Sequence, residues 1–240
     1  MDINNPHDSF FRRVFSNKEN VRDLLKNSLS EDIIRQIELD DINISFDTYV
    51  DEDLKSSESD MVVKTKLKGQ DLIIYFLYEH KSYKDKYSLF QLLKYMIKIW
   101  ETEKHNKREY FTPIVPVLYK HGEHKWTLGD SFSIYFPKDI PSFLSDYVPD
   151  FRSIIFDLSA ISDEDIQGNI WYKSAVQTMK HINEIRVYLK TVLEYIFSYY
   201  DYLNPLPPEF IELMRYVFIY FNSSDMIFIE GLFKQYQMEG

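Results

Sequence analysis

The chain has 240 residues, of which 45% are hydrophobic and 17% aromatic, and the few Gly (6) and Pro (9) exclude collagen-like and disordered classes. With no cysteine, disulfide scaffolds, thiol nucleophiles and thiolate zinc sites are excluded as well. The net charge of −10 argues against a protein that coats nucleic acid non-specifically, but it is compatible with a local basic cleft.

Helical spacing of apolar residues predicts two N-terminal helices, over 8–16 and 18–29. After an acidic, Ser-rich loop at 51–59, two strand-like runs follow at 60–67 and 71–79. The second run is apolar without interruption from Leu72 to Tyr78, which is far too short to span a bilayer. The N-terminal residues also lack the basic and apolar regions of a secretory signal. We therefore expect a soluble, cytoplasmic protein with no membrane partner.

The clearest predicted helix covers 86–104, with an apolar stripe made of Leu89, Leu93, Met96, Ile97 and Trp100. A strand is expected over 112–119, where Pro113 and Pro116 predict a position at a sheet edge or strand start. A polar turn should follow at 120–123.

Two further short strands are expected at 131–136 and 153–158, and the texture then becomes helical, over 168–202 and 209–221. The order predicts an α/β protein with an α-βββ-α-β front half and a helical back half. We place the boundary between the core domain, 1–160, and the helical region, 161–240.

Three charged residues are expected to converge at the open end of a hairpin. If Gly69-Gln70 forms its two-residue turn, Asp60 lies directly opposite Glu79, with their Cβ atoms about 4.5–5.5 Å apart. Strand alternation places Lys81 on the face of Glu79. Two carboxylates so placed can hold Mg²⁺ for phosphodiester hydrolysis, and a lysine can stabilise the charge that develops.

The spacing alone leaves simpler explanations open. A surface hairpin with a Glu–Lys pair and an unrelated Asp fits it somewhat better than a metal site does. Gln91 and Tyr95 share a helix face with Lys94 and Lys98 beside it, and with Lys84 these could form a basic DNA-binding surface or an ordinary solvated face. The pair His121-x-x-His124 has metal-like spacing but no third ligand in view.

The ordered set of motifs resembles the PD-(D/E)XK nuclease superfamily, in its variant with a Gln-x-x-x-Tyr helix motif. Within it, the chain is similar to the Rpn family of recombination-promoting nucleases, which are also labelled transposases. The resemblance runs in order over 7–158. The motifs that carry it are His7-Asp8-x-x-Phe11-Arg12, Ser59-Asp60, Tyr78-Glu79-His80-Lys81-Ser82, Gln91-x-x-x-Tyr95 with Phe90 and Lys94, and Pro113-Ile114-Val115-Pro116-Val117-Leu118-Tyr119 followed by Gly122 and Trp126.

The resemblance implies a PD-(D/E)XK nuclease-like core, in which helices flank a mixed central sheet, and the activity of a metal-dependent DNA endonuclease. Asp60 and Glu79 would be its metal ligands, for Mg²⁺ or alternatively Mn²⁺, and Lys81 its third catalytic residue, at a position where relatives carry Gln. Gln91, where many relatives carry Arg, and Tyr95 would be auxiliary positioning residues. A catalytically inactive nuclease-fold protein that acts by DNA or protein binding and an RNase are the alternatives, and a homo-oligomer is left open.

Overall fold

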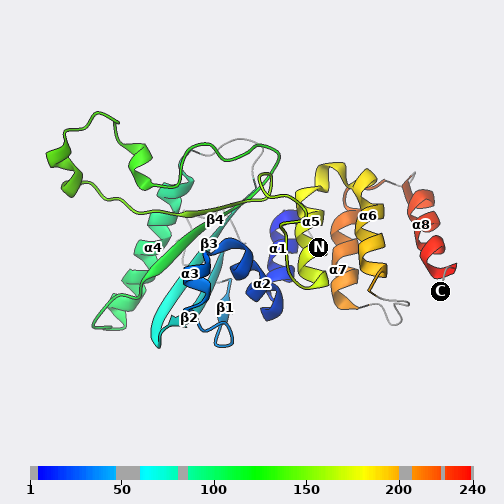
Figure 1. Cartoon of the computed structure of the whole chain (residues 1–240), viewed down its shortest axis with the longest axis horizontal. Helices are drawn as coiled ribbons and strands as arrows, with labels where there is room; N and C mark the ends of the chain where they lie inside the picture. The colour runs from blue at the N-terminus through cyan, green and yellow to red at the C-terminus, as the bar shows by residue number, and fades with distance from the viewer. Residues whose placement is uncertain (1–4, 47–59, 81–85, 200–206, 223–224, 239–240) are drawn as a thin grey trace. The chain divides into compact units, whose positions relative to one another are not determined.

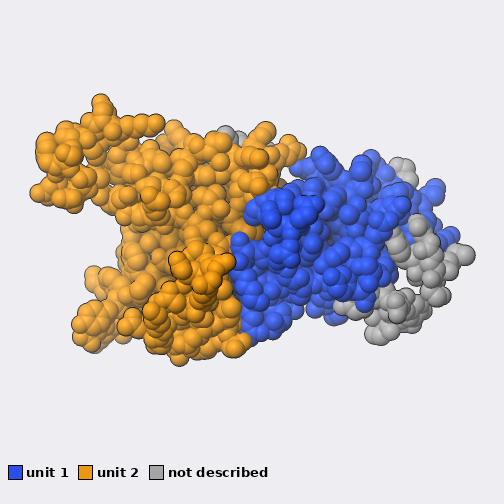
Figure 2. Space-filling model, in the orientation of Figure 1, with its two compact units in different colours: residues 1–27, 161–240 blue, residues 28–160 orange. Residues whose placement is uncertain are grey.

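The computed structural model describes residues 5–46, 60–80, 86–199, 207–222 and 225–238. The chain divides into two compact units, one of residues 1–27 with 161–240 and the other of residues 28–160 (Figure 2). The sheet belongs to the second unit, and the first is helical. In this division, residues 1–27 cluster with the C-terminal helices, whereas the sequence placed them in the core domain. The predicted domain boundary at residue 160 stays a prediction. No helix in the described parts of the chain has the length and apolar character needed to cross a membrane.

In the described residues of the sheet unit there are two helices, five strands and two short 3₁₀ helices. Figure 1 labels most of its helices and strands. Their bounds are α3 Glu31–Ile34, β1 Asn43–Ser45, β2 Met61–Leu67, β3 Gln70–His80, α4 Ser88–His105, β4 Ile114–His121, η2 Phe132–Tyr135, η3 Ser142–Tyr147 and β5 Ile154–Asp157. The elements of the helical unit are α1 Pro6–Phe15, α2 Lys18–Ser28, α5 Ile170–Lys180, η4 Ile182–Glu184, α6 Ile185–Phe197, α7 Pro208–Phe218 and α8 Met226–Met238.

The five strands form one mixed sheet in the order β1-β2-β3-β4-β5. The pairs β1–β2 and β2–β3 are antiparallel, whereas β3–β4 and β4–β5 are parallel. Parallel neighbours need a crossover connection, and α4 provides it between β3 and β4. The prediction of a mixed α/β fold with a mixed central sheet is therefore confirmed.

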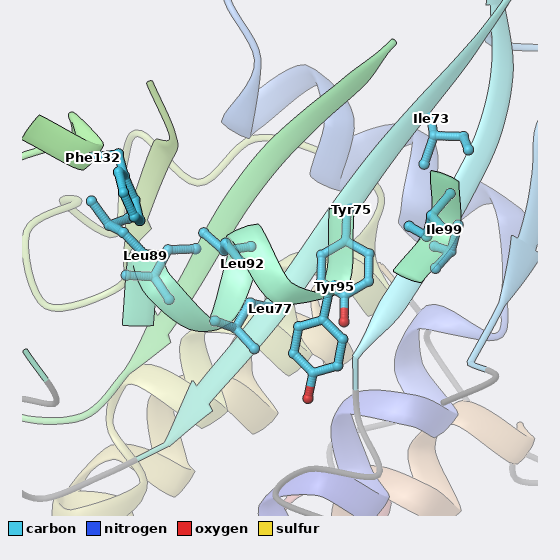
Figure 3. Close-up of a cluster of buried hydrophobic side chains, with 10 residues drawn as sticks. Ile73, Tyr75, Leu77, Leu89, Leu92, Tyr95, Ile99 and Phe132 are labelled. Carbon is cyan, nitrogen blue, oxygen red and sulfur yellow. The ribbon is translucent and has the colours of Figure 1, made fainter. Parts of the chain in front are cut away.

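Helix α4 packs on one face of the sheet, which we call the α4 face (Figure 3). The buried core there comprises Val62, Ile73, Tyr75, Leu77 and Leu118 from the strands, Leu89, Leu92, Tyr95 and Ile99 from α4, and Phe132. The predicted stripe of α4 is confirmed at Leu89 and Met96, which are buried, and wrong at Ile97, which is 45% exposed. Leu92, Tyr95 and Ile99 are buried as well. Tyr95 turns inward because its ring stacks on a strand tyrosine, a contact that residue polarity does not predict.

Strand β4 corrects two sequence expectations. It lies between β3 and β5, so the predicted sheet edge is wrong, whereas the alternative of a strand start fits Pro113, which directly precedes Ile114. The strand also extends to His121 through residues expected in a turn. Pro116 is tolerated because β5 pairing begins only at Val117, and the Pro116 carbonyl accepts a hydrogen bond from the Ser153 hydroxyl on that side. The strand expected at 131–136 is wrong, since it contains the 3₁₀ helix η2.

The hairpin of β2 and β3 has a different register from the expected one. Its turn is Lys68-Gly69, with φ of +52° and +80°, the pattern of a type I′ turn. Leu67 therefore pairs with Gln70, and continuation of the ladder places Asp60 opposite Leu77 instead of Glu79. The shift is two residues, and because side chains alternate with period two, every side chain keeps its expected face.

The turn yields a stability prediction. Gly69→Ala should lower the free energy of unfolding by about 1 kcal/mol, because φ is +80° and a Cβ would meet no atom within 4 Å, so the cost is purely conformational. Lys68→Asn should raise it by about 0.5 kcal/mol, since Asn favours the left-handed region in this turn. Urea unfolding of both variants measures these changes. An unchanged Gly69→Ala together with a destabilised Lys68→Asn would contradict the type I′ turn.

In the helical unit, Asp163 ties α5 to α6. Its carboxylate accepts hydrogen bonds from Lys180 Nζ at 2.5 Å and the Tyr188 hydroxyl at 2.6 Å, and it lies 2.9 Å from His181 Nε2. Burial alone raises the pKa of Asp163, but the bonds from Lys180, Tyr188 and His181 outweigh it and lower the pKa to about 2. The ionised form is therefore the one that the fold stabilises.

This cluster predicts a pH dependence of stability. Because the pKa of Asp163 is lowered on folding, its contribution is complete above the ordinary value of 3.8 and is lost as the pH falls towards about 2. Asp163→Asn should therefore be less stable than wild type near neutral pH, with a gap that narrows as the pH falls from about 4 to 2. Unfolding free energies measured across that window test it, and a gap that is independent of pH contradicts it.

Candidate active site

Asp60 immediately precedes β2 and is 2% exposed. Its Oδ2 accepts a hydrogen bond from the Tyr75 hydroxyl at 2.8 Å, and its Oδ1 accepts one from the Tyr78 backbone N–H at 3.4 Å. Both donors belong to β3, so the neighbouring strand fixes the orientation of the carboxylate. A buried carboxylate held in this way is pre-organised for a ligand.

Tyr75 connects Asp60 to α4. Its ring stacks on that of Tyr95, with centroids 5.2 Å apart and an interplanar angle of 24°. The Tyr95 hydroxyl in turn accepts a hydrogen bond from Gln91 Nε2 at 3.3 Å. Figure 3 shows the two rings side by side, with both hydroxyls on the same side of the pair. The predicted Gln91 and Tyr95 pair is thus linked to Asp60 through Tyr75, a residue that sequence reasoning missed.

Glu79 lies near the carboxyl end of β3 and is 7% exposed. Alternation along the strand places it on the same side as Tyr75 and Leu77, which is the α4 face. Asp60 accepts its hydrogen bond from Tyr75 on that face as well. The two predicted metal ligands are therefore buried carboxylates on one face of the sheet.

The next two strands, β4 and β5, each place a charged side chain in line with Glu79 in the register of the sheet. Lys120 of β4 is the register partner of Glu79, and Asp157 of β5 is the register partner of Lys120. Lys120 and Asp157 are both buried, with Nζ 3.6 Å from Oδ1. We call Glu79, Lys120 and Asp157 the charged row. It crosses the carboxyl ends of three parallel strands on the α4 face, and sequence reasoning missed it because Lys120 was expected in a turn.

Of the four lysines predicted to act at this site, two lie in the described part of the chain. Lys81 and Lys84 lie outside the described residues. Lys94 and Lys98 are partly buried on α4, on the flank that carries Gln91. Within the described parts of the chain, Lys94 makes no ion pair or hydrogen bond, so its charge is available to an anionic partner.

The opposite face of the sheet carries a histidine pair. His80 and His121 are register partners with ring centroids 4.4 Å apart, and His121 Nδ1 is hydrogen-bonded to the Tyr78 hydroxyl at 2.9 Å. Burial lowers the pKa of His80, a backbone hydrogen bond with His121 opposes this, and the charge of Lys120 adds to the lowering. His121 thus lies in a buried strand, whereas its expected companion His124 is exposed in the following loop.

The chemistry of the donors on the α4 face suits a hard divalent cation. Carboxylate oxygens are the protein ligands that Mg²⁺ and Mn²⁺ prefer, and Mg²⁺ usually takes only one or two of them and keeps several waters. Asp60 and Glu79 offer such oxygens from one face. A buried ammonium group beside them suits an anion such as a phosphate.

Residues 5–205 match the family described as "Putative transposase, YhgA-like". Among curated proteins, the chain is 28% identical over 127 residues to "Recombination-promoting nuclease RpnD" of Escherichia coli O157:H7, covering 51% of this chain and 49% of the relative. It is 24% identical over 118 residues to "Recombination-promoting nuclease RpnC" of Escherichia coli strain K12, covering 49% and 39%.

A third relative carries a different label. "Inactive recombination-promoting nuclease-like protein RpnE" of Escherichia coli strain K12 is 25% identical over 118 residues, covering 49% of this chain and 40% of the relative. Each of these matches therefore spans about half or less of the relative's length. No solved structure matches the chain.

The link between Tyr75 and Asp60 predicts an energetic coupling. Tyr75→Phe should lower the free energy of unfolding by about 1–3 kcal/mol, because it leaves a buried carboxylate without one of its donors. In an Asp60→Asn background the same substitution should cost less, since the acceptor is then neutral. Tyr95→Phe, which removes the acceptor of Gln91 and leaves the donor to Asp60 in place, is the matched control with a smaller loss. Equal losses for Tyr75→Phe in both backgrounds would disprove the coupling.

Proposed function

Because the chain belongs to the YhgA-like transposase family, we propose that it is a metal-dependent DNA endonuclease with a PD-(D/E)XK nuclease-like core. It hydrolyses phosphodiester bonds in a recombination-promoting or transposase-like role. The names of two relatives, RpnD and RpnC, support the nuclease class and DNA as the substrate. The mixed sheet with α4 on one face is compatible with such a core.

One observation carries the proposal: Asp60 and Glu79 are both buried on the α4 face. Burying carboxylates is costly unless a cation or hydrogen-bond donors offset their charge. Two of them on one face make sense if the site holds a divalent cation in its working state. A purely structural role would be met as well by neutral residues of similar size.

In the proposed mechanism, Asp60 and Glu79 hold Mg²⁺, or Mn²⁺ in its place. When bound, the metal lowers the pKa of a water and withdraws charge from the phosphate. Tyr75 and the Tyr78 backbone N–H keep the Asp60 carboxylate in one orientation. Lys81 orients the attacking water or stabilises the developing charge.

The remaining predicted residues position the substrate and the site. Gln91 and Tyr95 brace Tyr75 through the stacked rings, so they act through another residue rather than on the phosphate. Lys84, Lys94 and Lys98 are proposed to contact DNA phosphates, which lets an acidic protein bind nucleic acid locally. Such contacts predict an affinity that falls steeply with salt.

An inactive protein and an RNase are the two alternatives. The label of RpnE shows that inactive members exist among the relatives, but this chain carries Asp60, Glu79 and Lys81 together. Metal-assisted hydrolysis does not itself discriminate between sugars, so an RNase is the second alternative. Incubation with plasmid DNA and with RNA, each with Mg²⁺ or EDTA, separates the three cases.

The proposal predicts that Asp60→Asn and Glu79→Gln abolish plasmid cleavage in Mg²⁺ while the protein stays folded. Each variant removes a charged ligand from a two-carboxylate site, so the metal is left bound mainly by water. Lys81→Ala should also lose most activity, whereas Lys81→Gln should be milder. Plasmid nicking and a thermal melt are measured for each variant.

Glu109→Gln, which alters an exposed carboxylate, is the control and should cleave like wild type. Full activity of Asp60→Asn, or unfolding of Glu79→Gln, would mean that these carboxylates are structural and would refute the nuclease mechanism.

A further inference from the structure

We propose that Lys120 is a further catalytic residue of this site, whose ammonium group contacts the scissile phosphate beside Glu79. The inference rests on the proposed nuclease function and deepens it. It assigns to a lysine of β4 a part in binding the reacting phosphate, in addition to the part proposed for Lys81 of the preceding segment.

The position of Lys120 follows from the pairing of two parallel strands. Register places it directly beside Glu79, and parallel neighbours lie about 4.8 Å apart. Leu118, two residues earlier, belongs to the core under α4, so alternation places Lys120 on the α4 face as well. The ammonium group and the Glu79 carboxylate therefore share one face and one end of the sheet.

The N–H donors of the Lys120 ammonium group are buried and make no hydrogen bond within the described residues. The Lys120 side chain is 7% exposed. An ammonium group carries three donors, and burying it without acceptors costs free energy. A structural lysine would be expected to use these donors, whereas a residue that binds an anion keeps them for its ligand.

Asp157 forms an ion pair with Lys120 but accepts no hydrogen bond from its ammonium group. The Asp157 carboxylate already accepts hydrogen bonds from the Trp126 N–H at 2.6 Å, the Ser159 N–H at 3.0 Å and the Ser159 hydroxyl at 2.8 Å. Lys120 adds an ion pair at 3.6 Å. Because those three bonds would remain, the ammonium group can swing towards a phosphate without leaving Asp157 unpaired.

A second lysine–aspartate pair in the chain shows the contrast. In the helical unit, Lys180 Nζ donates to Asp163 at 2.5 Å and to the Ile161 carbonyl at 2.7 Å. Its donors are used within the fold, as expected for a structural pair. Lys180→Met is therefore a matched control for Lys120→Met, since both remove a lysine that is paired with aspartate.

The test compares Lys120→Met, Lys120→Arg and Lys180→Met with wild type by three measurements. These are plasmid cleavage in Mg²⁺, binding of a fluorescent DNA duplex in Ca²⁺, and Mn²⁺ binding followed by electron paramagnetic resonance. Thermal melts establish that each variant is folded. Lys120→Met removes one partner of a buried ion pair, which lowers stability, but Asp157 keeps its other three hydrogen bonds. Lys120→Arg provides a second variant that keeps the charge.

We expect Lys120→Met to lose about 100-fold in cleavage rate, the effect of removing one group that stabilises transition-state charge. Its DNA affinity should fall about tenfold, as for the loss of one charge-assisted hydrogen bond. Mn²⁺ affinity should stay close to wild type, because no ligand is removed. Lys120→Arg should recover part of both losses, and Lys180→Met should cleave like wild type.

The failures are distinguishable. If wild type cleaves DNA and Lys120→Met cleaves and binds it equally well, Lys120 is structural and this inference is overturned while the proposed function stands. If wild type cleaves no nucleic acid with either metal, the proposed function fails and the catalytic role of Lys120 fails with it. If Lys180→Met loses as much activity as Lys120→Met, the effect is one of general stability and the inference is overturned.

Discussion

Parallel pairing of β3 with β4 is the constraint on which the candidate site depends. It brings the carboxyl ends of two strands to the same edge, so that Glu79 and Lys120 stand side by side. It also demands a crossover, and α4 covers the face on which both side chains lie. The same pairing continues to β5 and adds Asp157 to the charged row. An antiparallel β4 would have placed its last residues at the other end of the sheet.

Polar groups on this face are tied together through aromatic side chains. Tyr75 donates to Asp60 while its ring stacks on Tyr95, so one side chain serves both the apolar core and the charged site. The core is therefore not independent of the site: a change in how α4 packs would move the donor on which the Asp60 carboxylate depends. This explains why a Gln–Tyr pair on a helix can matter for carboxylates that it does not touch.

Sequence reasoning recovered the mixed sheet and the common face of Asp60 and Glu79, although its hairpin register was wrong by two residues. The predicted face is nevertheless correct, because side-chain direction alternates with a period of two residues. A register error of two residues leaves every side chain on its face, whereas an error of one would move it to the opposite face. Lys120 was missed because Pro113 and Pro116 suggested an edge strand and its polar neighbours suggested a turn. Tyr75 was missed because a hydroxyl inside an apolar run gives no hint of its partner. Both depend on contacts between strands that are distant in sequence.

The distribution of strand lengths has a consequence for self-association. The long apolar strand β3, of 11 residues, is enclosed by β2 and β4, whereas the outermost described strands β1 and β5 have only 3 and 4 residues. A sheet polymerises through unpaired backbone groups at its borders, and short border strands offer few of them. Long apolar strands of this kind favour intermolecular cross-β structure, and the native pairing covers both sides of β3. Amyloid-like aggregation would require β3 to lose a neighbour first, so the stability of the sheet also protects the solubility of the chain.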